Sequence, residues 1–212
     1  MRLPPARATI GLVIITSGFW LASILTHHQD LWAMAAGFIP ARLNGWHSGI
    51  PSLPFWLTPL SATVVHEGIL HLGFNMLMLA FCGRYVEMVI GSGNFVFLYI
   101  VGAYVSAFSQ YWINPTSYYP MIGASGAISA LFGAYALLFG QERQFFSYRW
   151  LNHLIHIFWL ASAWIIIQTL IGFSESNDIS IATPAHIGGF LIGLLLIRPL
   201  LRFHYHKRFI NF

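Results

Sequence analysis

The chain has 212 residues, of which 57% are hydrophobic, 17% aromatic and only 8% charged. A soluble domain carries about 25% charged residues, so these few charges cannot cover a water-facing surface, and the composition indicates an integral membrane protein. The sequence pI is near 9.5, but the ten Lys and Arg residues lie singly or in pairs. This scatter argues against a nucleic-acid-binding face. A single cysteine, Cys82, excludes an intrachain disulfide, and we expect it to be a small buried side chain.

Six apolar stretches are long enough for membrane-spanning helices, which need about 20 mainly apolar residues. The first follows a cationic N-terminus but is not followed by a small-residue cleavage site, so we expect a retained helix and no signal peptide. The sequence therefore predicts an all-α membrane protein with a single domain over residues 1–212. Its six predicted spans are 9–26, 61–82, 94–113, 122–140, 153–173 and 182–201.

The stretch between the first two predicted spans is long for a connection and rich in Trp, Phe, Gly and Pro. It is too apolar for a free aqueous loop and too interrupted for a span. We expect it to lie in the membrane interface and to dip partly into the membrane.

Orientation follows from the distribution of cations. With an even number of spans both termini share a side, and nine of the ten Lys and Arg residues fall on that side, which predicts that both termini are cytoplasmic. Only Arg42 falls on the other side. The nine are Arg2, Arg7, Arg84, Arg143, Arg149, Arg198, Arg202, Lys207 and Arg208.

Polar side chains inside spans are costly and are candidates for function. At 1.5 Å per helical residue, Ser125 lies roughly 24 Å from Gln141 at the cytoplasmic end of its span. By the same count His186 lies roughly 18 Å, and His71 roughly 20 Å, from the first cation of their spans. These depths predict one common layer in the outer half of the membrane. Asn75 is expected one turn deeper than His71 and on the same helix face.

Two stripes of small residues explain how a serine and a histidine could meet. Residues spaced by four on two membrane helices let the backbones approach closely. One stripe contains the serine and the other passes beside His186. They are Ser125, Ser129 and Gly133, and Ala185, Gly189 and Gly193.

A serine beside an imidazole is an activated nucleophile, because the imidazole removes the hydroxyl proton as attack begins. Asn75, His71 and the backbone N–H of Ser125 are candidate donors to an oxyanion. Neither Glu67 nor Glu87 is well placed as a third member, so we predict a Ser-His dyad. Each polar residue alone is more often a packing feature, and it is their agreement in depth and direction that favours catalysis.

Three motifs resemble those of the rhomboid intramembrane serine proteases over nearly the whole chain. They are "HEGILHLGFN" (66–75) with "GRYVEMVIGSGNF" (83–95) after it, "GASGA" (123–127) and "AHIGGFLIG" (185–193). The resemblance implies that Ser125 is the nucleophile and His186 the base, and that His71 and Asn75 serve the oxyanion hole. It also implies six helices around a water-filled cavity, transmembrane helices as substrates and no cofactor or metal. We expect a bacterial inner (plasma) membrane protein.

The sequence departs from the family pattern in three places. Ser129 stands where the family often has an aromatic residue that packs on the base, which would leave His186 less constrained. The Trp-Arg pair often found in the first loop is absent, and "GWHSG" (45–49) is the nearest text. Pro184 before His186 is also unexpected, although proline suits a helix start.

Three alternatives compete with this interpretation. A membrane metalloprotease is suggested by "HEGILH", but His66 and His71 are five residues apart, whereas a zinc-binding pair on one helix face needs a spacing of four. A rhomboid-like protein could bind transmembrane clients without cutting them. A transporter or haem protein is conceivable from His153 and His156.

Overall fold

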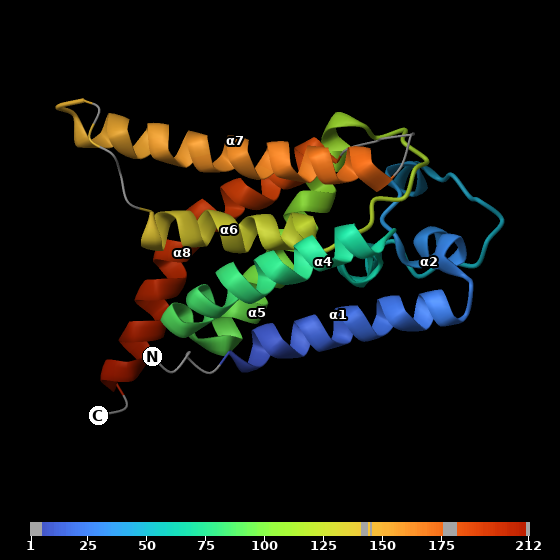
Figure 1. The fold of residues 1–212 in the computed structure, drawn as a ribbon, viewed down its shortest axis with the longest axis horizontal. Helices are drawn as coiled ribbons and strands as arrows, with labels where there is room; N and C mark the ends of the chain where they lie inside the picture. Colours follow the sequence, from blue (N-terminus) through green and yellow to red (C-terminus); the bar gives the residue numbers. More distant parts are fainter. Residues whose placement is uncertain (1–5, 141–143, 145, 176–181, 211–212) are drawn as a thin grey trace.

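The computed structural model describes residues 6–140, 144, 146–175 and 182–210 (Figure 1). Regular structure in these residues is helical, apart from an isolated antiparallel bridge between Phe38 and Met121. Three short helical turns are η1 (Pro40–Asn44), η2 (Ala62–Val64) and the π-helical η3 (Leu79–Gly83). The α-helices are α1 (Arg7–Leu25), α2 (Gln29–Ala36), α3 (Thr58–Ser61), α4 (Ile69–Met78), α5 (Arg84–Ile113), α6 (Ser125–Phe139), α7 (Arg149–Glu175) and α8 (Thr183–Ile210).

Three described segments are long and apolar enough to cross a membrane, which confirms an all-α membrane protein. They are Arg7–Leu25, Ile69–Ile113 and Thr183–His206, and α6 is a shorter apolar helix. The 45 residues of Ile69–Ile113 would extend about 68 Å as one straight helix, more than twice the hydrocarbon core. Gly91 breaks this segment with φ 78° and ψ 157°, and the chain reverses direction there (Figure 1).

Two predicted spans begin later than expected. The second was expected from residue 61, but α4 begins only at Ile69, because the backbone is extended at Val65 and at Gly68. The fourth was expected from residue 122, whereas α6 begins at Ser125. Gly123, with φ 105°, cannot continue a right-handed helix. Ser125 is therefore the first residue of its helix.

The centre of the molecule is the contact between α5, α6 and α8, where small residues let the backbones approach. A side chain at Gly189 of α8 would collide with the carbonyl oxygen of Gly126, and one at Gly193 with that of Ala130. Ser106 of α5 lies against both Gly126 and Gly189. The close approach expected from the small-residue stripes of α6 and α8 is confirmed.

Helix α1 is joined to the rest of the bundle by a buried carboxylate. Glu87 of α5 accepts hydrogen bonds from the backbone N–H of Ala8 (3.0 Å) and of Thr9 (2.9 Å), and from the Thr9 hydroxyl (2.7 Å). The Ser92 hydroxyl donates a fourth at 2.6 Å. The first N–H groups of a helix have no intrahelical acceptor and favour a negative charge. Glu87 therefore caps α1 from another helix.

The first loop is packed against the segment that precedes α6. The Phe38 N–H donates to the Met121 carbonyl at 3.0 Å, and the Met121 N–H donates back at 2.8 Å. Within the loop, Arg42 Nη2 donates to the Met34 carbonyl at 2.7 Å. These bonds give the loop a defined position beside the start of α6, while its insertion into the membrane stays a prediction.

The helices run between two ends of the bundle. Helix α1 begins and α8 ends at the same end, left in Figure 1, and α7 also begins there. Arg7 and Arg149 are the first residues of α1 and α7, so they lie at this end. Arg42 belongs to η1 at the opposite end, near α2 (Figure 1). Of the cations used to predict the orientation, Arg2, Arg143 and the side chains of Lys207 and Arg208 lie outside the described residues.

Candidate active site

Ser125 and His186 come from different helices and meet in the interior. The Ser125 Oγ lies 2.8 Å from the His186 Nε2, which is hydrogen-bond distance. Ser125 is 7% exposed and His186 is 6% exposed. Because α6 and α8 are in backbone contact through their glycines, two short side chains can span the gap between them. A neutral imidazole nitrogen here can accept the serine proton.

The turn before Ser125 depends on Gly123. Its φ of 105° lies in the left-handed region that side chains disfavour. A Cβ at this position would lie 2.6 Å from Nε2 of His71, so a glycine is needed both for the backbone conformation and for the contact. The Gly123 N–H donates to the Ala62 carbonyl at 2.9 Å. Ser125 therefore directly follows a turn of defined conformation. His71 packs against this turn at Gly123, which lies two residues before Ser125.

His66 is a site residue that sequence reasoning considered only as a zinc ligand. Its Nε2 accepts the backbone N–H of Ala124 at 3.3 Å, and its ring lies 5.0 Å from the ring of His71. His66 precedes α4. Burial first, and then the charge of His71, lower the pKa of His66 to about 3, against a smaller raising effect of the Val64 backbone. His66 is therefore neutral near pH 7, as an acceptor must be. Gly68, two residues later, was the available signal that His66 lies outside the helix.

Asn75 and His71 lie one turn apart on α4. Asn75 is fully buried, and its Nδ2 donates to the His71 carbonyl at 2.8 Å. One N–H of this amide remains for another acceptor. Asn75 Oδ1 has no hydrogen-bond partner among the described residues. The structure therefore brings His71 against the turn of Ser125, while the hydrogen bond of Asn75 stays within α4.

Neither a third catalytic member nor a metal site is found in the part of the chain that the structure describes. His186 Nδ1 has no hydrogen-bond partner there, and the Glu87 carboxylate is used by α1. No three His, Cys, Asp or Glu side chains are grouped to hold a metal ion. His153 and His156 lie near the start of α7, where His156 packs against Gly140 at the end of α6.

Residues 55–203 match the family model of the Rhomboid domain. The chain belongs to the rhomboid family. The match covers α3 to most of α8 and includes all four predicted site residues, whereas α1 and most of the first loop precede it.

Individual rhomboid proteins resemble the chain to different extents. Rhomboid protease GluP of Bacillus subtilis is 35% identical over 138 residues, which are 65% of this chain and 25% of that protein. Rhomboid protease GlpG of Pectobacterium atrosepticum is 30% identical over 172 residues, 76% of this chain and 57% of that protein. YdcA of Bacillus subtilis is 26% identical over 205 residues, 93% of this chain and 92% of that protein. The chain thus spans a quarter of GluP and just over half of this GlpG.

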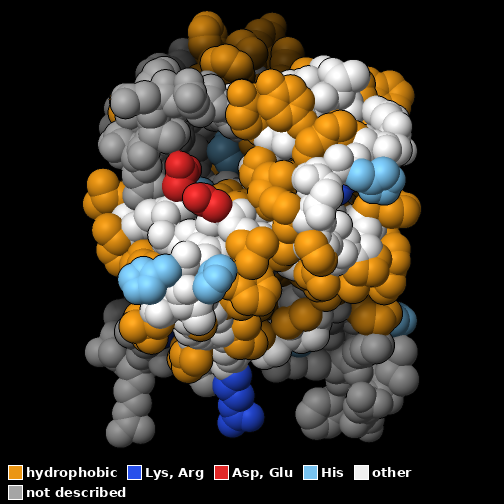
Figure 2. Space-filling view, turned by 90° about the vertical axis from the view of Figure 1, so that its right-hand side faces the viewer, with side chains coloured by type: hydrophobic (Ala, Val, Ile, Leu, Met, Phe, Trp, Pro, Cys, Tyr) orange, Lys and Arg blue, Asp and Glu red, His pale blue; other side chains and the backbone are white. Residues whose placement is uncertain are grey.

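The end of this rhomboid bundle that carries the first loop is hollowed. Figure 2 shows this end covered largely by hydrophobic side chains, with acidic side chains at the edge of a hollow and a histidine visible inside it.

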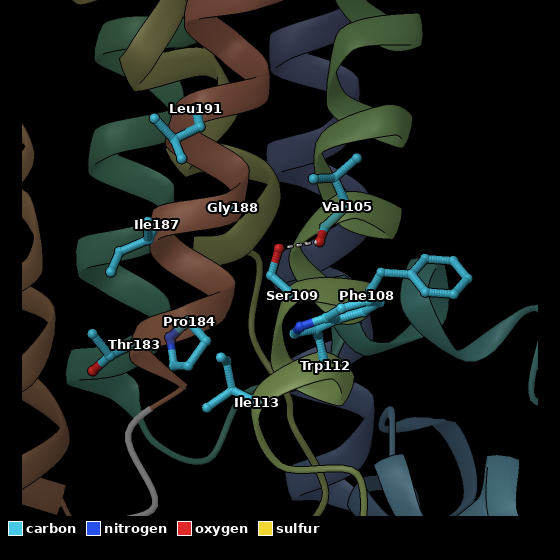
Figure 3. A pocket seen from close by; sticks show the side chains of 10 residues that line it. All are labelled: Val105, Phe108, Ser109, Trp112, Ile113, Thr183, Pro184, Ile187, Gly188 and Leu191. Carbon is cyan, nitrogen blue, oxygen red and sulfur yellow. Dashed lines mark hydrogen bonds between the residues drawn. The ribbon is translucent and has the colours of Figure 1, made fainter.

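A separate apolar groove of about 610 Å³ lies between α5 and α8 (Figure 3). Trp112 and Ile187 line it. Gly188, another lining residue, packs against Ser109, whose hydroxyl donates to the Val105 carbonyl at 2.8 Å. Ile187 and Gly188 follow His186 on α8, but His186 is directed to α6. The groove is therefore on another face of α8 than the Ser125–His186 pair.

Proposed function

We propose that this rhomboid protein is an intramembrane serine endopeptidase with Ser125 as nucleophile and His186 as general base. The observation that carries the proposal is the 2.8 Å hydrogen bond between Ser125 Oγ and His186 Nε2 at a buried helix start. Two relatives are named rhomboid proteases, which supports the same activity.

In the proposed reaction, Ser125 Oγ attacks the carbonyl carbon of the scissile peptide bond while its proton moves to His186 Nε2. The C–N bond then breaks, and the imidazolium returns the proton to the leaving amine. A water molecule, deprotonated by the same imidazole, hydrolyses the acyl-enzyme and restores Ser125. These steps use only protein groups and water.

The negative charge on the carbonyl oxygen needs donors during both attacks. The Ser125 N–H is at the first residue of α6, where helix N–H groups have no intrahelical acceptor. His71 lies against the adjacent Gly123, and Asn75 has an amide hydrogen to spare. We assign these three donors to the oxyanion hole.

The proposed topology has six spans with both termini in the cytoplasm of a bacterial inner membrane. It is supported by the reversal at Gly91, which divides the long apolar segment in two, and by the cations at the end where α1 and α7 begin. Ser125 then lies in the outer half of the membrane. The substrates are transmembrane helices cut near their extracytoplasmic ends, at sites where Gly, Pro or polar residues ease local unwinding.

The test is incubation of the purified protein with a panel of single-span membrane proteins. Wild type should release fragments, and Ser125→Ala should release none while keeping its unfolding temperature, because one hydroxyl is lost from a small-residue contact. Ser109→Ala, which removes a hydroxyl from α5 outside the site, is the matched control and should cleave like wild type. Stable binding of these proteins with no cleavage by wild type would instead indicate a client-binding protein.

A further inference from the structure

In the part of α7 whose side chains the structure describes, most side chains are exposed or half-buried, and one aromatic side chain is deeply buried. Phe158, Trp159 and Ile166 of α7 are 75%, 67% and 57% exposed. Among the α7 side chains that the structure describes, only Asn152 near its start and Trp164 are buried, and Trp164 is 1% exposed. Trp164 is thus a deeply buried anchor near the middle of this helix.

Trp164 reaches two helices that carry the active site. Its ring stacks on Phe132 of α6, with ring centroids 5.1 Å apart, and lies 5.9 Å from Phe74 of α4. Phe74 directly precedes Asn75. The indole Nε1 donates a hydrogen bond of 2.6 Å to the hydroxyl of Ser129 on α6.

Ser129 connects Trp164 to the nucleophile through a second hydrogen bond. Its hydroxyl donates to the backbone carbonyl of Ser125 at 2.7 Å, and Ser129 is fully buried. A hydroxyl has one proton to give. Because Trp164 occupies an acceptor position of the Ser129 oxygen, that proton is directed to Ser125. Two hydrogen bonds in series therefore join α7 to the main chain of Ser125.

The main chain of Ser125 determines where its hydroxyl points. Ser125 is the first residue of α6, and helix ends fray more readily than helix interiors. A bond that holds the Ser125 carbonyl restrains its peptide plane, and with it the direction from Cα to Oγ. A small misplacement of a reacting atom can cost up to about 10²-fold in rate.

We propose that Trp164 is a positioning residue for Ser125 and that Ser129 is the link through which it acts. This inference rests on the proposed function, since it concerns the reactivity of the nucleophile. The one N–H of the Trp164 indole donates to Ser129 and so is not given to the reacting hydroxyl. Trp164 acts by keeping Ser129 in the orientation that holds Ser125. Ser129 stands in a position that is often aromatic in the family. In this chain Ser129 supports Ser125 through a hydrogen bond that Trp164 of α7 holds in place.

The experiment measures the reaction of Ser125 with a small fluorophosphonate, a probe that needs no transmembrane helix and so separates nucleophile reactivity from substrate entry. Both the rate constant and the final labelled fraction are recorded. Trp164→Phe keeps an aromatic ring but removes the N–H donor, and Ser129→Ala removes the link itself. Trp159→Phe, on the exposed face of α7, and Ser109→Ala, which removes the same kind of hydroxyl-to-carbonyl bond from α5, are the matched controls.

Trp164→Phe and Ser129→Ala should each lower the rate constant about fivefold to tenfold, the effect of one hydrogen bond. The final labelled fraction, which counts folded protein, should stay at the wild-type value. The double variant should react no more slowly than the slower single variant, because both changes break one chain of bonds. In cleavage assays kcat should fall while KM stays constant.

Other results would overturn the inference. A rate constant for Trp164→Phe equal to that of Trp159→Phe would do so, as would multiplied effects in the double variant. Loss of labelled fraction with an unchanged rate constant would assign Trp164 to folding only. If Trp164→Phe fails to fold, the rate constant of Ser129→Ala is compared with that of Ser109→Ala, and equal values overturn the inference. If wild type itself did not react at Ser125, the proposed function would fail, whereas normal reaction of wild type and both variants would reject only this inference.

Discussion

His66 Nε2 accepts the backbone N–H of Ala124 at 3.3 Å, which joins the segment before α4 to the residue before Ser125. His66→Phe should fill a similar volume but leave this buried N–H without an acceptor, at a cost of about 1–3 kcal/mol. Thermal unfolding in detergent should show a lower midpoint, and substrate cleavage should slow. His47→Phe, at an exposed histidine of the first loop, should do neither. An unchanged midpoint in His66→Phe would mean that the bond does not support the site.

The same histidine predicts a dependence of stability on pH. The pKa of His66 is lowered to about 3 in the folded protein, whereas an unfolded histidine has a pKa of about 6.5. Between these values the unfolded state binds more protons, so stability decreases as the pH falls from about 6.5 towards 3. The free energy of unfolding of wild type should therefore fall more steeply over this range than that of His66→Phe. Parallel curves would contradict the role given to His66.

Gly123→Ala should damage the site more than an ordinary glycine substitution. A left-handed conformation costs an alanine about 1–2 kcal/mol, and the new Cβ would lie 2.6 Å from His71 Nε2. Cleavage should fall at least about tenfold. Gly93→Ala on α5, where no atom lies within 4 Å of an added Cβ, is the control. Equal activity of the two variants would show that the turn tolerates displacement.

Glu87 should matter for stability and not for chemistry. Glu87→Ala removes the acceptor of four hydrogen bonds from Ala8, Thr9 and Ser92 and leaves buried donors unpaired. We expect a loss of at least about 1–3 kcal/mol in unfolding free energy. Glu87→Gln keeps one acceptor oxygen and should lose less. Labelling of the folded fraction at Ser125 should keep its wild-type rate constant, and a slowed rate would place Glu87 in the catalytic machinery.

The oxyanion assignment predicts a graded loss of activity. Removal of one donor typically costs about 10²–10³-fold in kcat, so His71→Ala and Asn75→Ala should each be impaired but retain measurable cleavage. Leu77→Ala, at an exposed position of the same helix, should be fully active. Wild-type kcat in both site variants would show that these side chains only pack.

The proximity of Ser125 and His186 could be anticipated because helical periodicity determines the depth and the helix face of each side chain. Counting residues gives the depth of each side chain, and the spacing of glycines indicates which helix faces touch. The start of α6 could not be located in the same way, since the left-handed φ of Gly123 leaves no periodic signal. The expected span 122–140 therefore included three residues that belong to the preceding turn.

Contacts between distant segments were beyond prediction for a related reason. The bond from Ala124 to His66 joins residues 58 positions apart, and the bond from Trp164 to Ser129 joins residues 35 apart. Each depends on how one side chain enters a space between helices. The sequence showed only that Ser129 departs from the family pattern, and its partner became apparent from the packing of α7.

The central claim is that His186 activates Ser125 as the nucleophile, and the most direct measurement is peptide mapping after reaction with a fluorophosphonate. Wild type should carry one adduct, on Ser125. Ser125→Ala should carry none, and His186→Ala should react at least about 10²-fold more slowly, since general-base assistance is worth about 10²–10⁴-fold. An adduct on another residue, or a His186→Ala variant that reacts at the wild-type rate, would contradict the account.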